Sequence, residues 1–252
     1  MRLGNLGADG WGLLIAAPFL GSFIGVVIRR LPDGRPIVRS RSACEGCNAV
    51  LTPRDLLPLV SWVLARGRCR RCGHPLGWFY PAVEIAALIV ALIALAVDDM
   101  PRAALDCLLG WWLLTLAWID LRRWLLPDLL TLPLIVAGLG VAAVSGSDDV
   151  LDRALGAALG YLSLRAIAAA YRALRHREGL GRGDAKLLAA AGAWVGAMAL
   201  PEVILLAALA ALFAAAGLRL GGVRLHARSA LQFGPFLALA TWIIWLGGPI
   251  VF

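Results

Sequence analysis

The chain has few charged residues for its length. Only 16% of its 252 residues are charged, whereas 61% are hydrophobic. A soluble domain usually has about 25% charged and about 45–50% apolar residues, so the composition excludes an ordinary soluble protein. It predicts an all-α polytopic membrane protein, with about eight transmembrane helices and one small four-cysteine loop domain.

The first apolar run lacks the features of a cleaved secretory signal. A signal has positive charge before its apolar region and small residues at a cleavage site after it. Here only Arg2 precedes the run, whereas Arg29 and Arg30 follow it. We therefore expect residues 1–30 to form a retained first transmembrane helix.

Apolar runs predict the membrane spans. They lie at residues 11–28, 82–97, 103–119, 127–144, 151–171, 185–199, 202–218 and 231–250. Several are shorter than the ~20 residues of a full crossing, and only Pro201-Glu202 divides the sixth from the seventh, which leaves a count of seven open. The charge distribution favours eight.

The basic residues also predict an orientation. If both termini lie outside, the cytoplasmic loops at 29–81, 120–126, 172–184 (with Lys186 at its edge) and 219–230 contain 20 of the 24 Lys and Arg residues. The positive-inside rule produces this clustering. We therefore attribute the net charge of +8 to membrane topology and expect no nucleic-acid partner.

Cysteine is scarce, and four of the five cysteines lie in the only long polar segment, residues 31–81. Cys44-x-x-Cys47 and Cys69-x-x-Cys72 are separated by 21 residues. This pattern is typical of a tetrahedral zinc site with four cysteine ligands. Four thiolates close the coordination shell, so we predict a structural site. Unbound thiols are the alternative; a disulfide is disfavoured in a cytoplasmic loop.

Two features around the cysteines have alternative interpretations. Gly46 and Gly73 are expected to form the tight turns of the two knuckles, and His74 is left out of the ligand set because four sulfurs suffice. Basic side chains at positions 66, 68, 70 and 71 either attract anionic lipid headgroups or an acidic partner, or form a solvated face.

Two aspartates lie at the ends of apolar runs, where a charged side chain is unfavourable. Asp120 ends the third run, at the end of a helix that disfavours negative charge. Asp184 follows Gly181 and Gly183 in a Gly-x-Gly-Asp sequence. A carboxylate in a bilayer costs a few kcal/mol or more, so it tends to face a wet cavity or a partner. The third and fifth runs are both predicted to run inward, which brings Asp120 and Asp184 to the same membrane face, so we expect one shared active site.

The predicted pair has the chemistry of an aspartic endopeptidase. Two close carboxylates cannot both ionise cheaply, so one keeps a proton. The ionised member takes a proton from water while the other polarises the scissile carbonyl. Glycines without Cβ atoms let a substrate backbone approach. Candidates on the substrate side are Gly181, Gly183, Lys186 and Glu84, although Glu84 could instead reach headgroups or water.

The chain resembles the type IV prepilin peptidases, a branch of the GxGD membrane aspartic proteases. The likeness extends over Gly21-Ser22-Phe23, the cysteine-rich loop, Tyr80 to Glu84, Ile119-Asp120 with Leu126-Pro127-Asp128, Gly181 to Lys186, and Phe233 to Phe236. The resemblance implies that Asp120 and Asp184 are catalytic. It also implies removal of the basic leader of prepilins or pseudopilins, followed by N-methylation of the new N-terminal residue with S-adenosylmethionine.

These predictions divide the chain into residues 1–30, a first transmembrane helix; 31–81, a cytoplasmic zinc-binding loop domain; and 82–252, a membrane-embedded peptidase core. We expect the protein in a bacterial cytoplasmic (inner) membrane, in contact with lipid, with its active site facing the cytoplasm and a role in type IV pilus assembly or type II secretion. A peptidase without methylation, a proton-coupled transporter and a non-catalytic membrane scaffold are the alternatives.

Overall fold

The computed structural model describes the chain except residues 1–6, 40, 146, 177–180, 223–230 and 249–252. The described residues form helices, and their β-structure is limited to the isolated bridges Ala43–Val50 and Arg68–Pro75. The all-α prediction is therefore confirmed. The end of the predicted last run, and parts of the loops at 172–184 and 219–230, lie outside the described residues.

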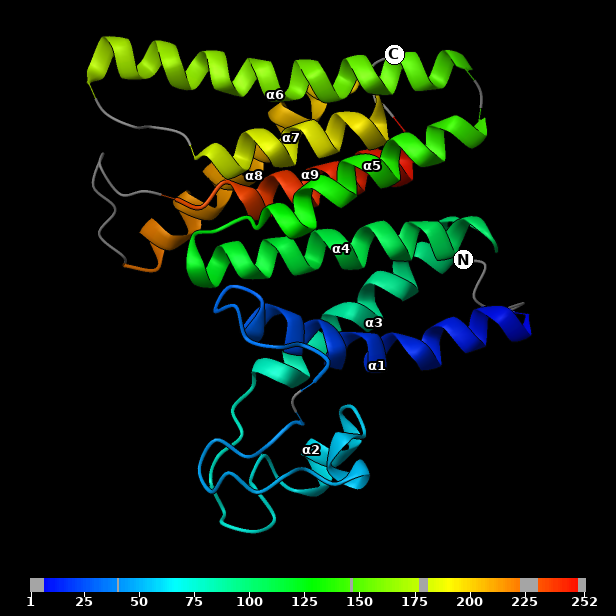
Figure 1. The fold of residues 1–252 in the computed structure, drawn as a ribbon, viewed down its shortest axis with the longest axis vertical. Helices are drawn as coiled ribbons and strands as arrows, with labels where there is room; N and C mark the ends of the chain where they lie inside the picture. Colours follow the sequence, from blue (N-terminus) through cyan, green and yellow to red (C-terminus); the bar gives the residue numbers. More distant parts are fainter. Residues whose placement is uncertain (1–6, 40, 146, 177–180, 223–230, 249–252) are drawn as a thin grey trace. The chain divides into compact units, whose positions relative to one another are not determined.

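Among the described residues, eight long helices coincide with the eight predicted apolar runs (Figure 1). They are α1 (Ala8–Arg30), α3 (Phe79–Val97), α4 (Arg102–Arg123), α5 (Asp128–Ser145), α6 (Ser147–Arg175), α7 (Arg182–Val195), α8 (Leu200–Leu220) and α9 (Gly234–Gly247). The 31–78 segment adds η2 (Pro53–Leu56) and α2 (Val60–Leu64).

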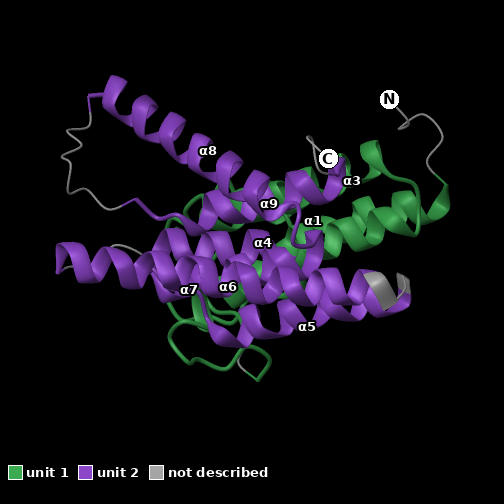
Figure 2. Ribbon diagram, turned by 90° about the horizontal axis from the view of Figure 1, so that it is seen from above, with its two compact units in different colours: residues 1–111 green, residues 112–252 purple. Residues whose placement is uncertain are grey.

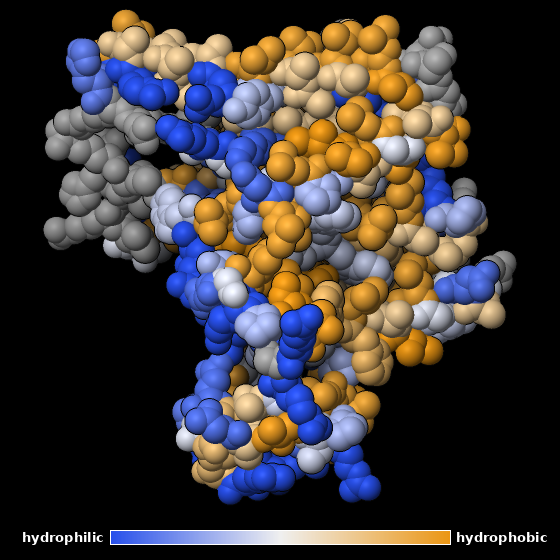
Figure 3. All heavy atoms as spheres, in the orientation of Figure 1, coloured by the Kyte–Doolittle hydropathy of each residue, from blue (hydrophilic) through white to orange (hydrophobic). Residues whose placement is uncertain are grey.

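Five of the described helices, α1, α3, α4, α6 and α8, are long and apolar enough to cross a membrane, while α5 and α9 are shorter apolar helices. Apolar residues, drawn in orange, dominate the visible helix surfaces in Figure 3. The chain is thus a helical membrane protein, and the count of eight spans stays a prediction.

The break between α7 and α8 has a local cause. Gly196 follows the last residue of α7 with φ 86° and ψ 172°, a non-helical conformation that favours glycine. Pro201 then lies in the first turn of α8, where its missing N–H does no harm. The sixth and seventh predicted runs are therefore two separate helices.

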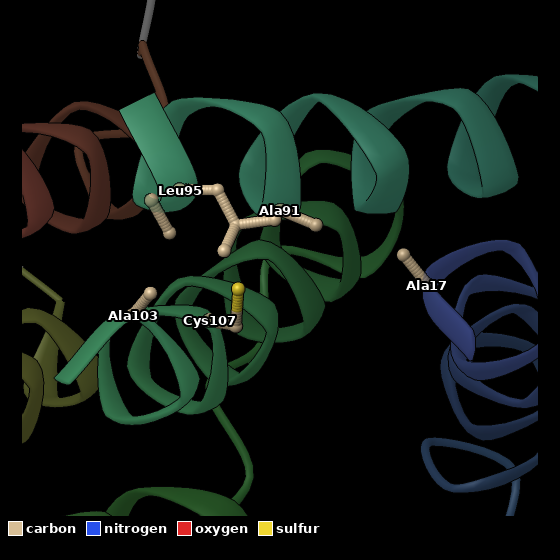
Figure 4. Close-up of a cluster of buried hydrophobic side chains, with 6 residues drawn as sticks. Ala17, Ala91, Leu95, Ala103 and Cys107 are labelled. Carbon is tan, nitrogen blue, oxygen red and sulfur yellow. The ribbon is translucent and has the colours of Figure 1, made fainter. Parts of the chain in front are cut away.

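The chain divides into two compact units, residues 1–111 and 112–252 (Figure 2). In the first unit α1 packs against α3, and small buried side chains around Leu95 form a core cluster (Figure 4). The cluster consists of Ala17, Ala91, Ala94, Leu95, Ala103 and Cys107. Because these side chains are short, the helix backbones can approach closely.

Helix α7 is the centre of the second unit. It packs against α5, α6, α8 and α9, and every residue from Leu187 to Trp194 is buried. Glycines allow its close contact with α6: a Cβ atom on Gly156 would lie 2.6 Å from the Gly192 carbonyl oxygen. The Trp194 indole N–H donates a 2.9 Å hydrogen bond to the Leu134 carbonyl of α5. This packing fixes the N-terminal turn of α7, which contains Asp184.

Candidate active site and metal centre

Asp184 is the third residue of α7, and Gly181 is the N-cap residue of that helix, with extended φ and ψ of −69° and 142°. The Gly181 N–H donates a hydrogen bond to the Asp184 carboxylate. An acidic side chain at the third helical position commonly makes this contact in a capping box. A Cβ atom on Gly181 would lie 3.1 Å from Asp184 Oδ2. The first glycine therefore gives the carboxylate room to turn back over the helix end.

The second glycine makes room for the segment before α5. A Cβ atom on Gly183 would lie 2.9 Å from the Cβ atom of Leu126, whose side chain is buried. One turn away, Lys186 forms an ion pair with Asp128, the first residue of α5. Gly183 and Lys186 thus hold the first turn of α7 against the start of α5.

Asp120 lies in the last turn of α4 and is only 7% exposed. The Gly234 N–H donates a hydrogen bond to its carboxylate. The Gln232 side-chain amide donates a 2.8 Å hydrogen bond to the Asp120 carbonyl oxygen. Since Gly234 begins α9, the positive end of that helix dipole faces the carboxylate. This contact offsets the unfavourable position of Asp120 near a helix C-terminus.

The contact with Asp120 requires a residue without a Cβ atom at position 234. A Cβ atom at this position would lie 2.6 Å from Asp120 Oδ2. Gly234 and Gln232 were not predicted as site residues, because they lie more than a hundred residues from Asp120 along the chain. The signal at this position was that residues 233–236 belong to the resemblance to the prepilin peptidases.

The two aspartates lie in the same unit and interact. The charge of Asp120 acts on the carboxyl group of Asp184. Asp120 is buried, whereas Asp184 is half-buried and so keeps contact with the surface. The second unit therefore brings together, from α4 and α7, two carboxylates of unequal exposure.

Glu84 has a different environment. It is 5% exposed in α3, and its Oε2 accepts a 2.8 Å hydrogen bond from the Leu59 N–H. The Ser22 hydroxyl of α1 donates a second hydrogen bond to it. Its described partners are thus protein groups of the first unit, and they connect α1, α3 and the residues before α2.

The four cysteines of the 31–78 segment form a cluster, with all four Sγ atoms within 4.8 Å of one another. The two knuckles repeat one backbone pattern. In the first, the Cys44 N–H bonds to the Ala49 carbonyl and the Asn48 N–H to the Cys44 carbonyl, each at 2.9 Å. In the second, the Cys69 N–H bonds to the His74 carbonyl at 2.8 Å and the Gly73 N–H to the Cys69 carbonyl at 2.9 Å. The second turn in particular matches the expected role of Gly73.

Gly46 lies in the turn of the first knuckle, where its N–H donates a 3.4 Å hydrogen bond to Cys44 Sγ, but it does not have the positive φ of that knuckle. The residue with positive φ in the first knuckle is Asn48, at 53°, in the position that Gly73 occupies in the second, at 72°. Gly46 instead makes room for a side chain, since a Cβ atom there would lie 2.6 Å from His74 Cγ. His74 packs on the first knuckle and is not one of the four clustered ligands.

Electrostatics favour a cation among the four sulfurs. The backbone N–H groups of Cys72 and Arg71 lower the pKa of Cys69 to about 6. The His74 N–H lowers the pKa of Cys72, but the Cys47 thiol, burial and the Cys69 thiol outweigh it and raise that pKa to about 12. Four sulfurs this close cannot all become thiolates without a positive charge between them. The donor set fits a thiophilic metal ion.

Two family models match the chain, the bacterial peptidase A24 N-terminal domain over residues 15–97 and the type IV leader peptidase family over residues 107–216. Together they match parts of both compact units. No solved structure matches the chain.

Curated relatives match along most of their length. A protein of Aeromonas hydrophila is 40% identical, covering 91% of this chain and 87% of the relative. A protein of Dickeya chrysanthemi is 39% identical, covering 90% and 89%, and one of Pseudomonas aeruginosa is 38% identical, covering 94% and 88%. Each is named prepilin leader peptidase/N-methyltransferase. The chain therefore belongs to the type IV leader peptidase family.

Proposed function

We propose that this protein is a membrane aspartic endopeptidase that removes the basic leader peptide of type IV prepilins or pseudopilins and then N-methylates the new N-terminal residue. The names of its relatives support both activities. The observation that carries the peptidase half is the interaction between Asp120 and Asp184 in one unit. A proton-coupled transporter explains neither the paired helix ends nor the Gly-x-Gly-Asp turn.

In the proposed reaction the two aspartates share one proton. The ionised carboxylate removes a proton from a water molecule, which attacks the scissile carbonyl carbon, while the protonated carboxyl group donates a hydrogen bond to the carbonyl oxygen. The tetrahedral diol collapses as the amine leaves with a proton. Gly181 lets the Asp184 carboxylate turn back over the helix end, and Gly183 lets the start of α7 pack against Leu126, so the two glycines position Asp184 for this step. The partial exposure of Asp184 supports access for water and substrate.

The four-cysteine cluster is proposed to hold zinc in a structural role. Cys44, Cys47, Cys69 and Cys72 supply a complete tetrahedral set, which leaves no coordination position for a substrate. The methyl donor in the proposed second activity is S-adenosylmethionine, which supplies the methyl group to the newly freed amine.

The proposed setting is a bacterial cytoplasmic (inner) membrane, with both termini outside and the aspartates at the cytoplasmic face. The location of 20 of the 24 basic residues in the inward loops supports this orientation. We propose that residues 1–30 anchor the chain, residues 31–81 form the metal-binding domain and residues 82–252 form the peptidase core. With prepilin or pseudopilin substrates, the protein would act in type IV pilus assembly or type II secretion.

Co-expression with a prepilin tests both activities. Wild type is expected to release the leader and to yield a mature N-terminus heavier by one methyl group in mass spectrometry. The Asp120→Asn/Asp184→Asn double variant, produced in the same host at the same level, should leave the prepilin intact. Absence of leader removal by the wild type would refute the peptidase. Cleavage without added methyl mass would restrict the protein to proteolysis.

A further inference from the structure

A short stretch of the loop between α1 and α3 exposes apolar side chains. In residues 56–64 five large apolar side chains are between 44% and 70% exposed: Leu56, Leu57, Val60, Val63 and Leu64. Helix α2, which makes up most of this stretch, contains no buried residue. A cluster of exposed apolar side chains commonly marks an interaction site.

The anchoring of this stretch places it beside a membrane-crossing helix. The Leu59 N–H donates its hydrogen bond to Glu84, which lies five residues after Phe79, the first residue of α3. Five residues correspond to about 7.5 Å along a helix axis. The 19 residues of α3 give it a length of about 28 Å, close to the ~30 Å hydrocarbon thickness of a bilayer. Leu59 therefore lies at the hydrocarbon edge of the leaflet in which α3 begins, or deeper in that leaflet.

The attachment holds Leu59 in a defined conformation. Its φ of 58° is uncommon for any residue with a Cβ atom. The acceptor, Glu84, is itself fixed by the Ser22 hydroxyl of α1. Residues on either side of Leu59 are thereby kept next to the helix pair instead of extending freely into water.

The surroundings of the stretch suit a lipid interface. Trp62 and Trp78 lie with their ring centroids 4.2 Å apart, and Trp78, directly before α3, is 69% exposed. Tryptophan is enriched where hydrocarbon meets headgroups. Residues 31–78 contain eight arginines and three acidic residues. This charge complements anionic headgroups, which attract basic segments next to a membrane helix.

We propose that residues 56–64 form an interfacial anchor, which inserts its apolar side chains into the leaflet where α3 begins and holds the four-cysteine domain against the membrane. Lipid is the occupant that both the depth of Leu59 and the charge of the segment favour. Leu56, Leu57, Val60, Val63 and Leu64 contact acyl chains, and the two exposed arginines that flank the stretch, Arg54 and Arg66, contact headgroups. The proposal does not depend on the peptidase or methyltransferase activity.

Photo-crosslinking in nanodiscs of phosphatidylethanolamine and phosphatidylglycerol tests the anchor. A benzoylphenylalanine residue replaces Val63 in one variant and Arg71, which is exposed in the second cysteine knuckle, in the control. The expected result is a phospholipid adduct of the protein at position 63, in several-fold higher yield than at position 71. Equal adduct yields at the two positions, or a cross-link from position 63 to a second copy of the chain, would overturn the proposal.

A second probe position guards against a local folding defect. Benzoylphenylalanine at Leu57, on the other side of Leu59, is expected to give the same lipid adduct, and both labelled proteins should retain the metal content of the wild type. Lipid adducts at neither position in proteins that keep their metal would also overturn the proposal.

Discussion

The metal centre and the aspartate pair are built in opposite ways. All four cysteines belong to one segment of under thirty residues, and each knuckle is closed by backbone hydrogen bonds between residues five apart. The aspartates lie on α4 and α7, and one of them depends on the first residue of α9. The metal centre thus needs only its own segment and an ion, whereas the aspartate site needs the packed second unit. Substitutions should therefore damage the two sites separately.

The largest expected effect is at the metal centre. Cys44→Ser removes a buried ligand, and structural zinc sites of this kind contribute on the order of 10 kcal/mol to folding of their domain. We expect the purified variant to contain no stoichiometric zinc by elemental analysis. Cys107→Ser is the matched control, because Cys107 is equally buried but belongs to the core cluster of α1, α3 and α4. Retention of a full equivalent of zinc by Cys44→Ser would contradict the four-cysteine site.

The next largest effect is expected from the aspartates one at a time. General acid–base groups contribute about 10²- to 10⁴-fold to the reaction rate. Asp120→Asn and Asp184→Asn should therefore each lower the rate of leader removal by at least about 10²-fold. Zinc content should remain that of the wild type. Asp149→Asn, which changes an exposed acid of α6, serves as the control and should cleave normally. Wild-type rates in either single variant would rule out a shared proton.

A smaller loss is expected from a methyl group at Gly234. In Gly234→Ala the added Cβ would meet Asp120 Oδ2 at 2.6 Å, so the carboxylate must move. Displacing a reacting group by about 1 Å can cost on the order of 10²-fold in rate. Gly217→Ala in α8 is the control, since nothing lies within 4 Å of the added atom. Equal cleavage rates in the two variants would show that Gly234 does not position Asp120.

The smallest effect is expected at the ion pair between α7 and α5. Asp128 is largely exposed, and exposed pairs typically contribute about 0.2–1 kcal/mol. Lys186→Met should therefore lower thermal stability slightly and the cleavage rate by less than about tenfold. A loss as large as that of the aspartate variants would indicate that Lys186 acts directly on the substrate.

The same contrast explains how much the sequence could predict. The cysteine spacing predicted the four-sulfur cluster because a knuckle is determined by residues next to one another. Asp120 and Asp184 were recognisable because a carboxylate at these helix ends is costly and needs a partner. The eight apolar runs likewise matched the eight long helices, since hydrophobicity is a local property.

Contacts between distant residues were beyond such reasoning. Gly234 and Gln232 contact Asp120 only after α9 has packed in the second unit, and no spacing in the sequence records that contact. The positive φ of the first knuckle belongs to Asn48, and Gly46 makes room for His74, a residue 28 positions away in the sequence. Glu84 gained its partners from Leu59 and Ser22, both distant in sequence.

The proposed peptidase site requires residues 120 and 184 to lie close together, which cross-linking can measure directly. Asp120→Cys/Asp184→Cys, in a Cys107→Ser background with the metal bound, is treated with a short bifunctional thiol reagent. The control pair is Asp120→Cys/Asp152→Cys, because Asp152 accepts a hydrogen bond from Ala197 just beyond the far end of α7, about 16 Å along that helix from Asp184. Mass spectrometry of digested protein should show the 120–184 cross-link and no 120–152 cross-link. Failure of residues 120 and 184 to cross-link, in protein that retains its metal, would contradict a shared aspartate site.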